Sequence, residues 1–422
     1  MNWLAKLRKG YGKKLVRLHT WNGWIVVILA ISGLILLGGF WRGILGEGRV
    51  WLKGLHIVVG IASIMPVIYY LLLAGKHWKQ LREKPWQRFN VLVVLGLLLG
   101  WFISGILLWQ FRAVGPAWAN AALVVHDLLT WIGLPYIIYH SITRAKWLKE
   151  PQRRTIRDES TASGEEVVGV GGRGIHPAAG PQAVYSRRTV IKWSIGAGLA
   201  VVVGPSFLQW LGKSLGPGLG GGGSIDEILA RDGNHLAPPP EPLPASLPPS
   251  GGGARGNFRI YTVTPIPTFN NDNWSFTIDG LVDKPMKWNW EKFVALKRKV
   301  QVSDFHCVTG WSVYSNTWEG ISLKDFLREA GVQATAKTVK FYSGDGVYTD
   351  TLTLEQAGLD DVMVAVMHDG KPIPSDLGGP VRLIVPKMYA YKSVKWLNRI
   401  ELIEGEHVGY WEERGYANDA WV

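Results

Sequence analysis

The stretch "HDLLTWIGLPYIIYH", residues 126–140, lies in a long apolar run and carries a histidine at each end. Along an α-helix this spacing gives a rise of about 21 Å and places His126 and His140 about 40° apart on one face. Ionisable side chains inside a bilayer are costly, usually functional, and face other helices. A single such histidine could simply hydrogen-bond across helices. The pair instead predicts a membrane-spanning helix with two functional positions at different depths.

Other apolar runs have the same character. Five stretches approach the ~20 residues needed to cross a bilayer, and they lie roughly at 18–40, 52–75, 90–110, 121–143 and 190–211. Their connecting segments alternate between basic and nearly uncharged. By the positive-inside rule, the N-terminus is cytoplasmic and the first four helices run up and down. We therefore expect a multi-pass protein of the cytoplasmic membrane, with everything after residue 211 extracytoplasmic.

The charge of the chain is divided unevenly. Residues 257–422 contain 18 Lys+Arg and 21 Asp+Glu, whereas the first 256 residues contain 28 and 12. Because the basic residues flank apolar runs, they indicate contact with membrane lipid and argue against nucleic acid as a partner. Cys307 is the only cysteine, which excludes an internal disulfide framework.

Two further histidines match the depths of the first pair. His19 lies near the cytoplasmic end of the first expected span, and His56 near the outer end of the second. His19 with His140, and His56 with His126, would form an inner and an outer bis-histidine site for two b-type haems. His77 lies in the basic segment "GKHWKQ" and is interpreted as a surface residue.

Residues 12–148 resemble the four-helix cytochrome b family of the b561 type, which includes the membrane subunits of hydrogenases and formate dehydrogenases. The histidines and the glycine-rich faces "ISGLILLGG" and "GLLLGWFISG" carry the resemblance. It implies an all-α transmembrane haem bundle that passes electrons between a quinone pool and a soluble redox domain.

The fifth span begins with "SRRTVIKWSIGAGLAVVVGPS", in which Arg187 and Arg188 precede a Gly/Ala-rich apolar run. It resembles a twin-arginine export signal inside the chain, which would make the export machinery for folded proteins a partner. The alternative is an ordinary basic flank of an anchor helix. The expected division of the chain is 1–149 haem bundle, 150–189 cytoplasmic linker, 190–211 anchor helix, 212–256 Gly/Pro-rich tether and 257–422 extracytoplasmic domain.

Residues 257–422 have a different pattern. Short β-branched and aromatic runs end at Gly, Pro or Asp and predict strands: "FRIYTVT", "WSFTIDGLV", "TVKFYSG", "VYTDTLTL", "VMVAVMHDG" and "VRLIVP". The segment "SLKDFLREAG" predicts a helix that begins after a serine and ends at a glycine. The region is therefore expected to be a β-rich α+β domain.

Cys307, in "SDFHCVTGWSV", allows three interpretations by itself. It could be a small buried apolar residue, a nucleophile, or a soft metal ligand. His306 is poorly suited as a base for a nucleophile, because neighbouring side chains in a strand point to opposite faces.

The segments "HCVTGWSV", "WEGISLKDFL", "FYSGDGVYTDTL" and "DGKPIPSDLGGPVRLIVPKMYAYKSVKWLNRIEL" resemble bacterial sulfite-oxidase-like molybdopterin oxidoreductases. The resemblance implies that Cys307 coordinates molybdenum beside the dithiolene of molybdopterin. It also implies cofactor-binding roles for six residues: Asn270, Ser343, Arg382, Ser393, Val394 and Lys395. Tyr348 is expected to lie near the metal's open position. Arg382 and Lys395 suit the pterin phosphate, although ordinary ion pairing would also explain them.

Two departures from that family bear on the substrate. Sulfite oxidases have arginines directly after the metal cysteine, where this chain has "VTGW", and Leu377 stands where related chains have Asn or His. The pattern around Cys307 is nearer to protein-methionine-sulfoxide reductase catalytic subunits. The expected activity is reduction of a small-molecule or protein-bound oxidised substrate with electrons from quinol. The alternatives are oxidation of an external substrate such as sulfite, with electrons passed to quinone, and a non-enzymatic electron-transfer protein.

Overall fold

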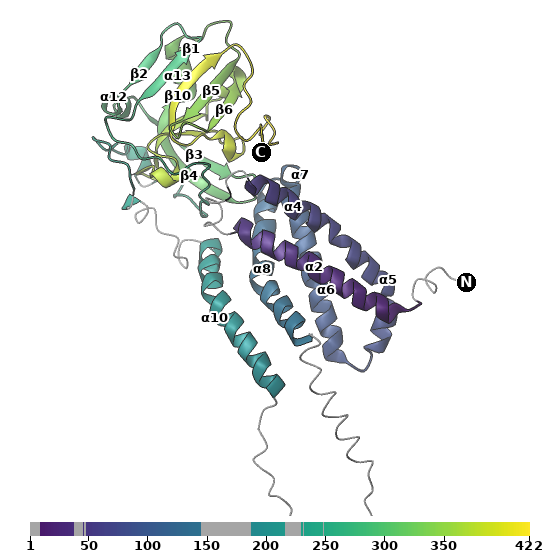
Figure 1. Cartoon of the computed structure of the whole chain (residues 1–422). Helices are drawn as coiled ribbons and strands as arrows, with labels where there is room; N and C mark the ends of the chain where they lie inside the picture. Colours follow the sequence, from purple (N-terminus) through teal and green to yellow (C-terminus); the bar gives the residue numbers. More distant parts are fainter. Residues whose placement is uncertain are drawn as a thin grey trace, which may run out of the picture. The chain divides into compact units, whose positions relative to one another are not determined.

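The computed structural model describes residues 9–37, 45, 48–144, 187–215, 229–230, 232–247 and 249–422. Backbone packing divides the chain into one unit of residues 1–126 with 209–422 and another of residues 127–208. The helices of the N-terminal part and the sheets of the C-terminal part are described separately below (Figure 1).

The N-terminal part is helical. Its helices are α2 (Tyr11–Leu37), α4 (Gly48–Ala62), α5 (Ile64–Gln80), α6 (Pro85–Trp109), α7 (Phe111–Val114) and α8 (Pro116–Arg144). Helix α2 packs against α4 and α5, and α6 packs against α4 and α5. The described residues include four segments long and apolar enough to cross a membrane, namely 11–37, 48–80, 85–109 and 116–141. They match the first four expected spans.

The second of these segments is interrupted at Ser63, between α4 and α5. Pro66 has no N–H to donate to the carbonyl four residues earlier, so the helical hydrogen-bond ladder is broken there. The Ser63 hydroxyl instead donates to Gly60 O at 2.6 Å. The break leaves the combined length sufficient to span a bilayer.

The fifth expected span falls within α10 (Arg187–Leu215). This helix is not among the four segments that meet the apolar criterion in the described residues. Its role as an anchor, and the export signal at Arg187 and Arg188, stay predictions.

The C-terminal part contains two five-stranded sheets (Figure 1). The first has the order β2-β1-β10-β5-β6, in which only β1 and β10 are parallel. Its strands are β1 (Phe276–Gly280), β2 (Met286–Trp288), β5 (Thr338–Ser343), β6 (Thr349–Thr353) and β10 (Leu397–Ile403). The second has the order β3-β4-β7-β8, with β9 also paired to β7. Its strands are β3 (Lys299–His306), β4 (Ser312–Ser322), β7 (Met363–His368), β8 (Lys371–Pro372) and β9 (Arg382–Ile384).

Short helices connect these strands: α12 (Trp290–Val294), α13 (Leu323–Ala330), α14 (Leu354–Ala357), η2 (Pro244–Ser246), η3 (Ser375–Leu377) and η4 (Ala390–Lys392). Helix α13 begins after Ser322 and ends at Gly331 with φ of 69°, as the sequence predicts. The main core joins aromatic and aliphatic side chains of both sheets, including Phe276, Phe341 and Val364.

Two expectations differ from the structure. The stretch "FRIYTVT", residues 258–264, forms no strand within the described chain; the Tyr261 carbonyl accepts a hydrogen bond from Lys395 Nζ. Residues 232–247 and 249–256, which belong to the expected tether, pack on the domain. Leu243 N donates to Glu319 Oε2, and Ala254 N donates to Asp369 Oδ2. These backbone groups exchange water for one buried and one partly buried carboxylate, which fixes the segment.

Gly320 permits the close approach of β4 to β7. A Cβ atom there would lie 2.2 Å from Val364 O, a backbone atom that cannot rotate away. We expect Gly320→Ala to lower the free energy of unfolding by about 1–3 kcal/mol through overpacking. Thermal unfolding of the purified full chain measures this. The control is Gly405→Ala, because a Cβ at Gly405 would meet nothing within 4 Å; equal melting temperatures for the two variants would contradict the account.

Candidate functional site

Cys307 lies in the tight turn between β3 and β4. Its N–H donates to Trp311 O at 3.0 Å, and its carbonyl accepts from Gly310 N at 2.9 Å. Gly310 has φ of 91°, a conformation that L side chains rarely adopt and that glycine allows. The turn holds the Cys307 side chain on the wall of a pocket, with Sγ 3.3 Å from Thr309 Oγ1.

Residues far apart in the sequence meet at this pocket. Six of the predicted site residues line it: Cys307, Ser343, Tyr348, Arg382, Ser393 and Lys395. They come from the β3–β4 turn, the end of β5, the β5–β6 connection, the start of β9 and the segment after η4. The structure therefore brings together most of the residues that the resemblance singled out.

Arg382 is almost completely buried, with 2 % of its surface exposed. It donates from Nη1 to Leu377 O at 2.5 Å and from Nη2 to Ser393 O at 3.2 Å, and it stacks over Phe305. These partners carry no negative charge, and Nε finds no acceptor among the described residues. Burial lowers the pKa of Arg382 to about 9. A buried guanidinium with a spare N–H suits an anionic ligand.

Lys395 adds a second cation to the same wall. Its Nζ donates to Tyr261 O at 3.0 Å and to Asp376 O at 3.4 Å. Burial, and then repulsion from Arg382, lower the pKa of Lys395 to about 7. Two cations that repel one another beside a pocket would both be stabilised by a bound anion.

Leu377 has a role that its side chain does not suggest. Its carbonyl, and not its side chain, accepts from Arg382. The following glycines make this possible, because a Cβ at Gly379 would lie 1.7 Å from Ile373 O. Leu377 stands where related chains have Asn or His, but the contact with Arg382 is made by the backbone and does not depend on the side chain.

Two other predicted residues lie elsewhere. The Asn270 Oδ1 accepts from the backbone N–H groups of Asp272 and Asn273, both at 3.0 Å, and so closes a local turn. Val394 is buried in the core, where its carbonyl accepts from Leu383 N at 2.8 Å. Neither belongs to the described lining of the pocket.

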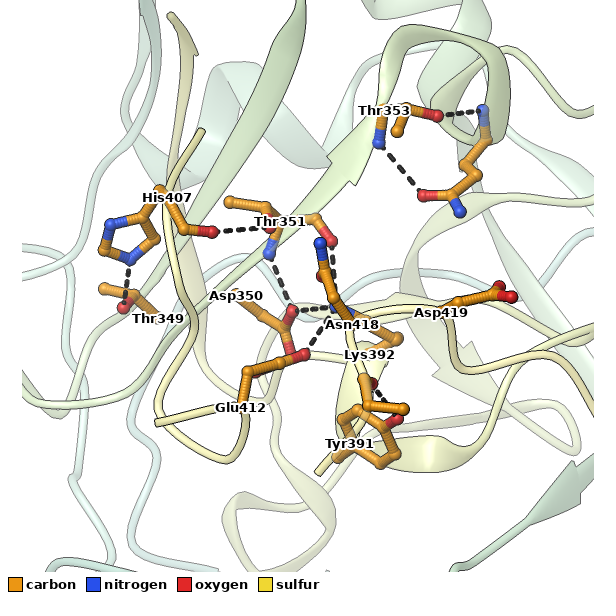
Figure 2. Close-up of polar contacts among 12 residues, drawn as sticks. Thr349, Asp350, Thr351, Thr353, Tyr391, Lys392, His407, Glu412, Asn418 and Asp419 are labelled. Carbon is orange, nitrogen blue, oxygen red and sulfur yellow. Dashed lines mark hydrogen bonds and ion pairs between the residues drawn. The ribbon is translucent and has the colours of Figure 1, made fainter. Parts of the chain in front are cut away.

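Behind Tyr348 lies a buried charged cluster that sequence reasoning missed. Lys392 Nζ lies 2.7 Å from Asp350 Oδ1, 2.5 Å from Glu412 Oε1 and 2.9 Å from Asn418 Oδ1 (Figure 2). The side chains of the lysine and the two acids are at most 4 % exposed. The sequence held one possible signal of this cluster: Asp350 lies in the threonine-rich strand β6, and Asp is uncommon in strands.

Two histidines of the helical part also meet. The rings of His56 on α4 and His126 on α8 have centroids 6.3 Å apart. Ser32 Oγ lies 2.8 Å from His56 Nδ1 and donates its single hydrogen to Ile28 O, also at 2.8 Å. The Ser32 hydroxyl therefore lies within hydrogen-bond distance of both a carbonyl of its own helix and the imidazole of His56.

Ser104 repeats this arrangement. Its Oγ lies 2.9 Å from His126 Nδ1 and donates to Gly100 O at 2.7 Å. Metal–imidazole bonds of about 2 Å on either side of one ion would place two ring centroids roughly 6 Å apart. The 6.3 Å separation of the His56 and His126 rings is compatible with that spacing. Pairing of His19 with His140 stays a prediction.

Comparison with known proteins agrees with the pocket. The family described as "Oxidoreductase molybdopterin binding domain" matches residues 263–411. The uncharacterised oxidoreductase YuiH of Bacillus subtilis (strain 168) is 33% identical over 168 residues, which are 39% of this chain and 84% of that protein.

Two relatives are named for sulfoxide reduction. The putative protein-methionine-sulfoxide reductase subunit YedZ1 of Azospira oryzae is 31% identical over 139 residues, 33% of this chain and 52% of that protein. The protein-methionine-sulfoxide reductase catalytic subunit MsrP of Campylobacter jejuni is 28% identical over 166 residues, 36% of this chain and 56% of that protein. The chain thus spans about half the length of each of these two. From the extent of the YuiH match, the chain belongs to the family of oxidoreductases with a molybdopterin-binding domain.

Proposed function

We propose that this chain is a membrane-bound molybdenum enzyme that reduces a sulfoxide-type substrate outside the cytoplasm with electrons from quinol. In this proposal two b-type haems in the helical part carry the electrons to the C-terminal domain. The observation that carries the proposal is Cys307 on the wall of a pocket that also holds Arg382 and Lys395.

The donor set of the pocket fits molybdopterin. A cysteine thiolate is a soft ligand suited to a transition metal, and the two buried cations suit a phosphate. Arg382 keeps an unpartnered Nε within the described residues, so it has a hydrogen bond to offer. When bound, the cofactor supplies a metal that exchanges an oxygen atom and two electrons with the substrate.

The residues of the chain would bind the cofactor, shield the pocket from water and hold a proton. Cys307 would hold the metal, and Arg382 and Lys395 would hold the phosphate. Phe305, Trp311 and Trp411 would limit access of water to the pocket. Tyr348, whose hydroxyl donates to Tyr391 O at 2.5 Å, would hold a proton at the edge of the reaction space.

The residues after Cys307 favour an uncharged substrate. Val308, Thr309 and Trp311 line the pocket where an arginine would be needed to bind an anion such as sulfite. A sulfoxide is neutral overall and does not require a positively charged arginine at this position. The two relatives named for methionine-sulfoxide reduction support this choice.

Oxidation of an anionic substrate is the second candidate. The observation in its favour is Arg259, which is also among the residues lining the pocket. In this direction electrons would flow from the substrate to quinone.

The outer haem would be bound by His56 and His126. Their mutual distance and their hydrogen bonds to Ser32 and Ser104 support this part of the proposal. The inner haem would be bound by His19 and His140. The cytoplasmic N-terminus, the export of the folded domain and the quinone partner are parts of the same proposal, because a cofactor inserted before export needs a route for folded proteins.

Turnover of the purified full chain tests the direction and the substrate. We expect a quinol analogue to be oxidised in the presence of sulfoxides, because the pocket suits a neutral acceptor. We expect little or no quinone reduction with sulfite. Sulfite oxidation at a rate above sulfoxide reduction would favour the second candidate, and molybdenum well below one per chain would remove the enzyme proposal.

Cofactor content tests the phosphate assignment. We expect Lys395→Gln to weaken retention of molybdopterin about tenfold or more, since a charge-assisted hydrogen bond is worth about 1.5–3 kcal/mol. Pterin fluorescence and molybdenum analysis after dialysis measure this. The control is Lys340→Gln, because Lys340 lies on β5 over the ring of Tyr342 and does not line the pocket. Equal retention in both variants would be evidence against a role for Lys395.

The spectrum of the reduced protein tests the outer haem. We expect Ser104→Ala to weaken haem binding at His126 by about 10–100-fold, the usual effect of removing a ligand's hydrogen-bond partner. The midpoint potential of that haem should rise, since a less basic imidazole stabilises ferric iron less. Ser63→Ala is the control, because its hydroxyl makes the same kind of bond to a helix carbonyl, that of Gly60. A potential unchanged in Ser104→Ala would count against the assignment.

A further inference from the structure

We propose that Asp350, together with Lys392 and Glu412, stores a proton that Tyr348 passes into the pocket. This inference rests on the proposed function, because it assigns a proton source to the reaction at the same site. The family resemblance singled out Tyr348 but not Asp350, Lys392 or Glu412.

The cluster contains two carboxyl groups and one ammonium group. Lys392 Nζ contacts Asp350 Oδ1 at 2.7 Å and Glu412 Oε1 at 2.5 Å. Asp350 is fully buried, and Lys392 is 1 % exposed. With all three groups charged, the cluster would keep one uncompensated negative charge away from water, which is costly. One bound proton makes it neutral.

The hydrogen bonds of Tyr348 point to the same protonation state. Its hydroxyl oxygen lies 2.5 Å from Tyr391 O and 3.2 Å from Asp350 Oδ2. A tyrosine has one hydroxyl hydrogen, and the carbonyl can only accept. If that hydrogen goes to the nearer carbonyl, the contact with Asp350 is favourable only when Asp350 supplies a hydrogen. A protonated Asp350 satisfies both contacts.

The titratable groups around Asp350 come from three segments. Tyr348 directly precedes β6, Tyr391 and Lys392 lie on η4, and Glu412 lies in the segment after β10. Burial, and then the negative charge of Glu412, raise the pKa of Asp350 to about 7, although Lys392 opposes the shift. Burial, and then Asp350, raise the pKa of Tyr348 well above its ordinary value, which keeps its hydroxyl protonated. Near neutral pH, Asp350 can therefore both hold and release a proton.

The position of the cluster connects it to the pocket. Tyr348 and Tyr391 line the pocket, whereas Asp350 and Lys392 lie behind them. Asp350 and Tyr348 are two residues apart along an extended segment, so their side chains share a face. Within the cluster, Glu412 Oε2 has no hydrogen-bond partner among the described residues and offers a place for a returning proton.

The proposed reaction needs this supply. Reduction of a sulfoxide breaks the S–O bond, takes up two electrons and two protons, and releases a sulfide and water. The electrons come from quinol. Tyr348 gives its hydroxyl proton to the departing oxygen and takes the proton of Asp350, and the electron pairs stay on the oxygens. The cluster holds one proton at a time, so it supplies one of the two and is then reloaded.

Infrared difference spectroscopy of the purified full chain between pH 5 and 9 tests the store directly and needs no substrate. We expect a protonated carboxyl band that titrates near pH 7 in the wild type and is absent in Asp350→Asn. In Glu412→Gln the midpoint should move to lower pH, because the negative charge that raises the pKa of Asp350 is gone. Asp360→Asn is the control, since Asp360 is fully exposed and pairs with Lys324; it should leave the band unchanged.

The pH profile of turnover tests delivery of the proton. With a chemically reduced viologen as donor and methionine sulfoxide as substrate, we expect Asp350→Asn to lower kcat about 10²-fold or more with little change in KM. The wild-type decline in kcat above about pH 7 should be lost. A residue that only supports the fold would change stability and leave the shape of this profile intact.

The outcomes separate this inference from the proposed function. A band assigned to Asp350 in a protein that reduces no sulfoxide leaves the proton store in place and removes the proposed substrate. Sulfoxide reduction without a carboxyl band near pH 7, or with the same pH profile in wild type and Asp350→Asn, overturns the proton store and keeps the function.

Discussion

The buried guanidinium of Arg382 is the constraint on which the functional pocket depends. It joins the carbonyl of Leu377, the carbonyl of Ser393 and the ring of Phe305, two residues before Cys307. Three segments that form the pocket are thereby fixed to one side chain. Burying a charge without a counter-ion is expensive, so a protein keeps such an arrangement where a ligand supplies the opposite charge. In the proposed function, the phosphate of the cofactor supplies that charge.

The same principle explains the contrast between the two charged groups of the domain. Arg382 and Lys395 leave positive charge in excess beside Cys307, whereas Asp350 and Glu412 exceed Lys392 by one negative charge behind Tyr348. The first excess suits a phosphate, and the second suits a proton. An oxygen-atom transfer that ends in water needs both a held cofactor and a supply of protons. Tyr348 and Tyr391 lie between the two groups.

Sequence patterns predicted what depends on local spacing. Hydropathy located the four apolar spans, and depth along the helices paired His56 with His126, whose rings meet in the structure. Motif order selected six residues that share one pocket. Contacts between distant segments could not be predicted in this way. Asp350, Lys392 and Glu412 lie on separate segments, and no local pattern relates them. Ser32 and Ser104 were hidden inside glycine-rich faces, while Asn270 followed a motif but closes a local turn. The stretch 258–264 has the composition of a strand, but it forms none within the described residues, and its Tyr261 carbonyl accepts from a lysine side chain.

The most direct test of the account is X-ray absorption at molybdenum in the purified full chain and in Cys307→Ser. The account predicts stoichiometric molybdenum in the wild type, with one more sulfur ligand than in Cys307→Ser. Molybdenum with the same number of sulfur ligands in both proteins would contradict the assignment of Cys307, and with it the arrangement of the site.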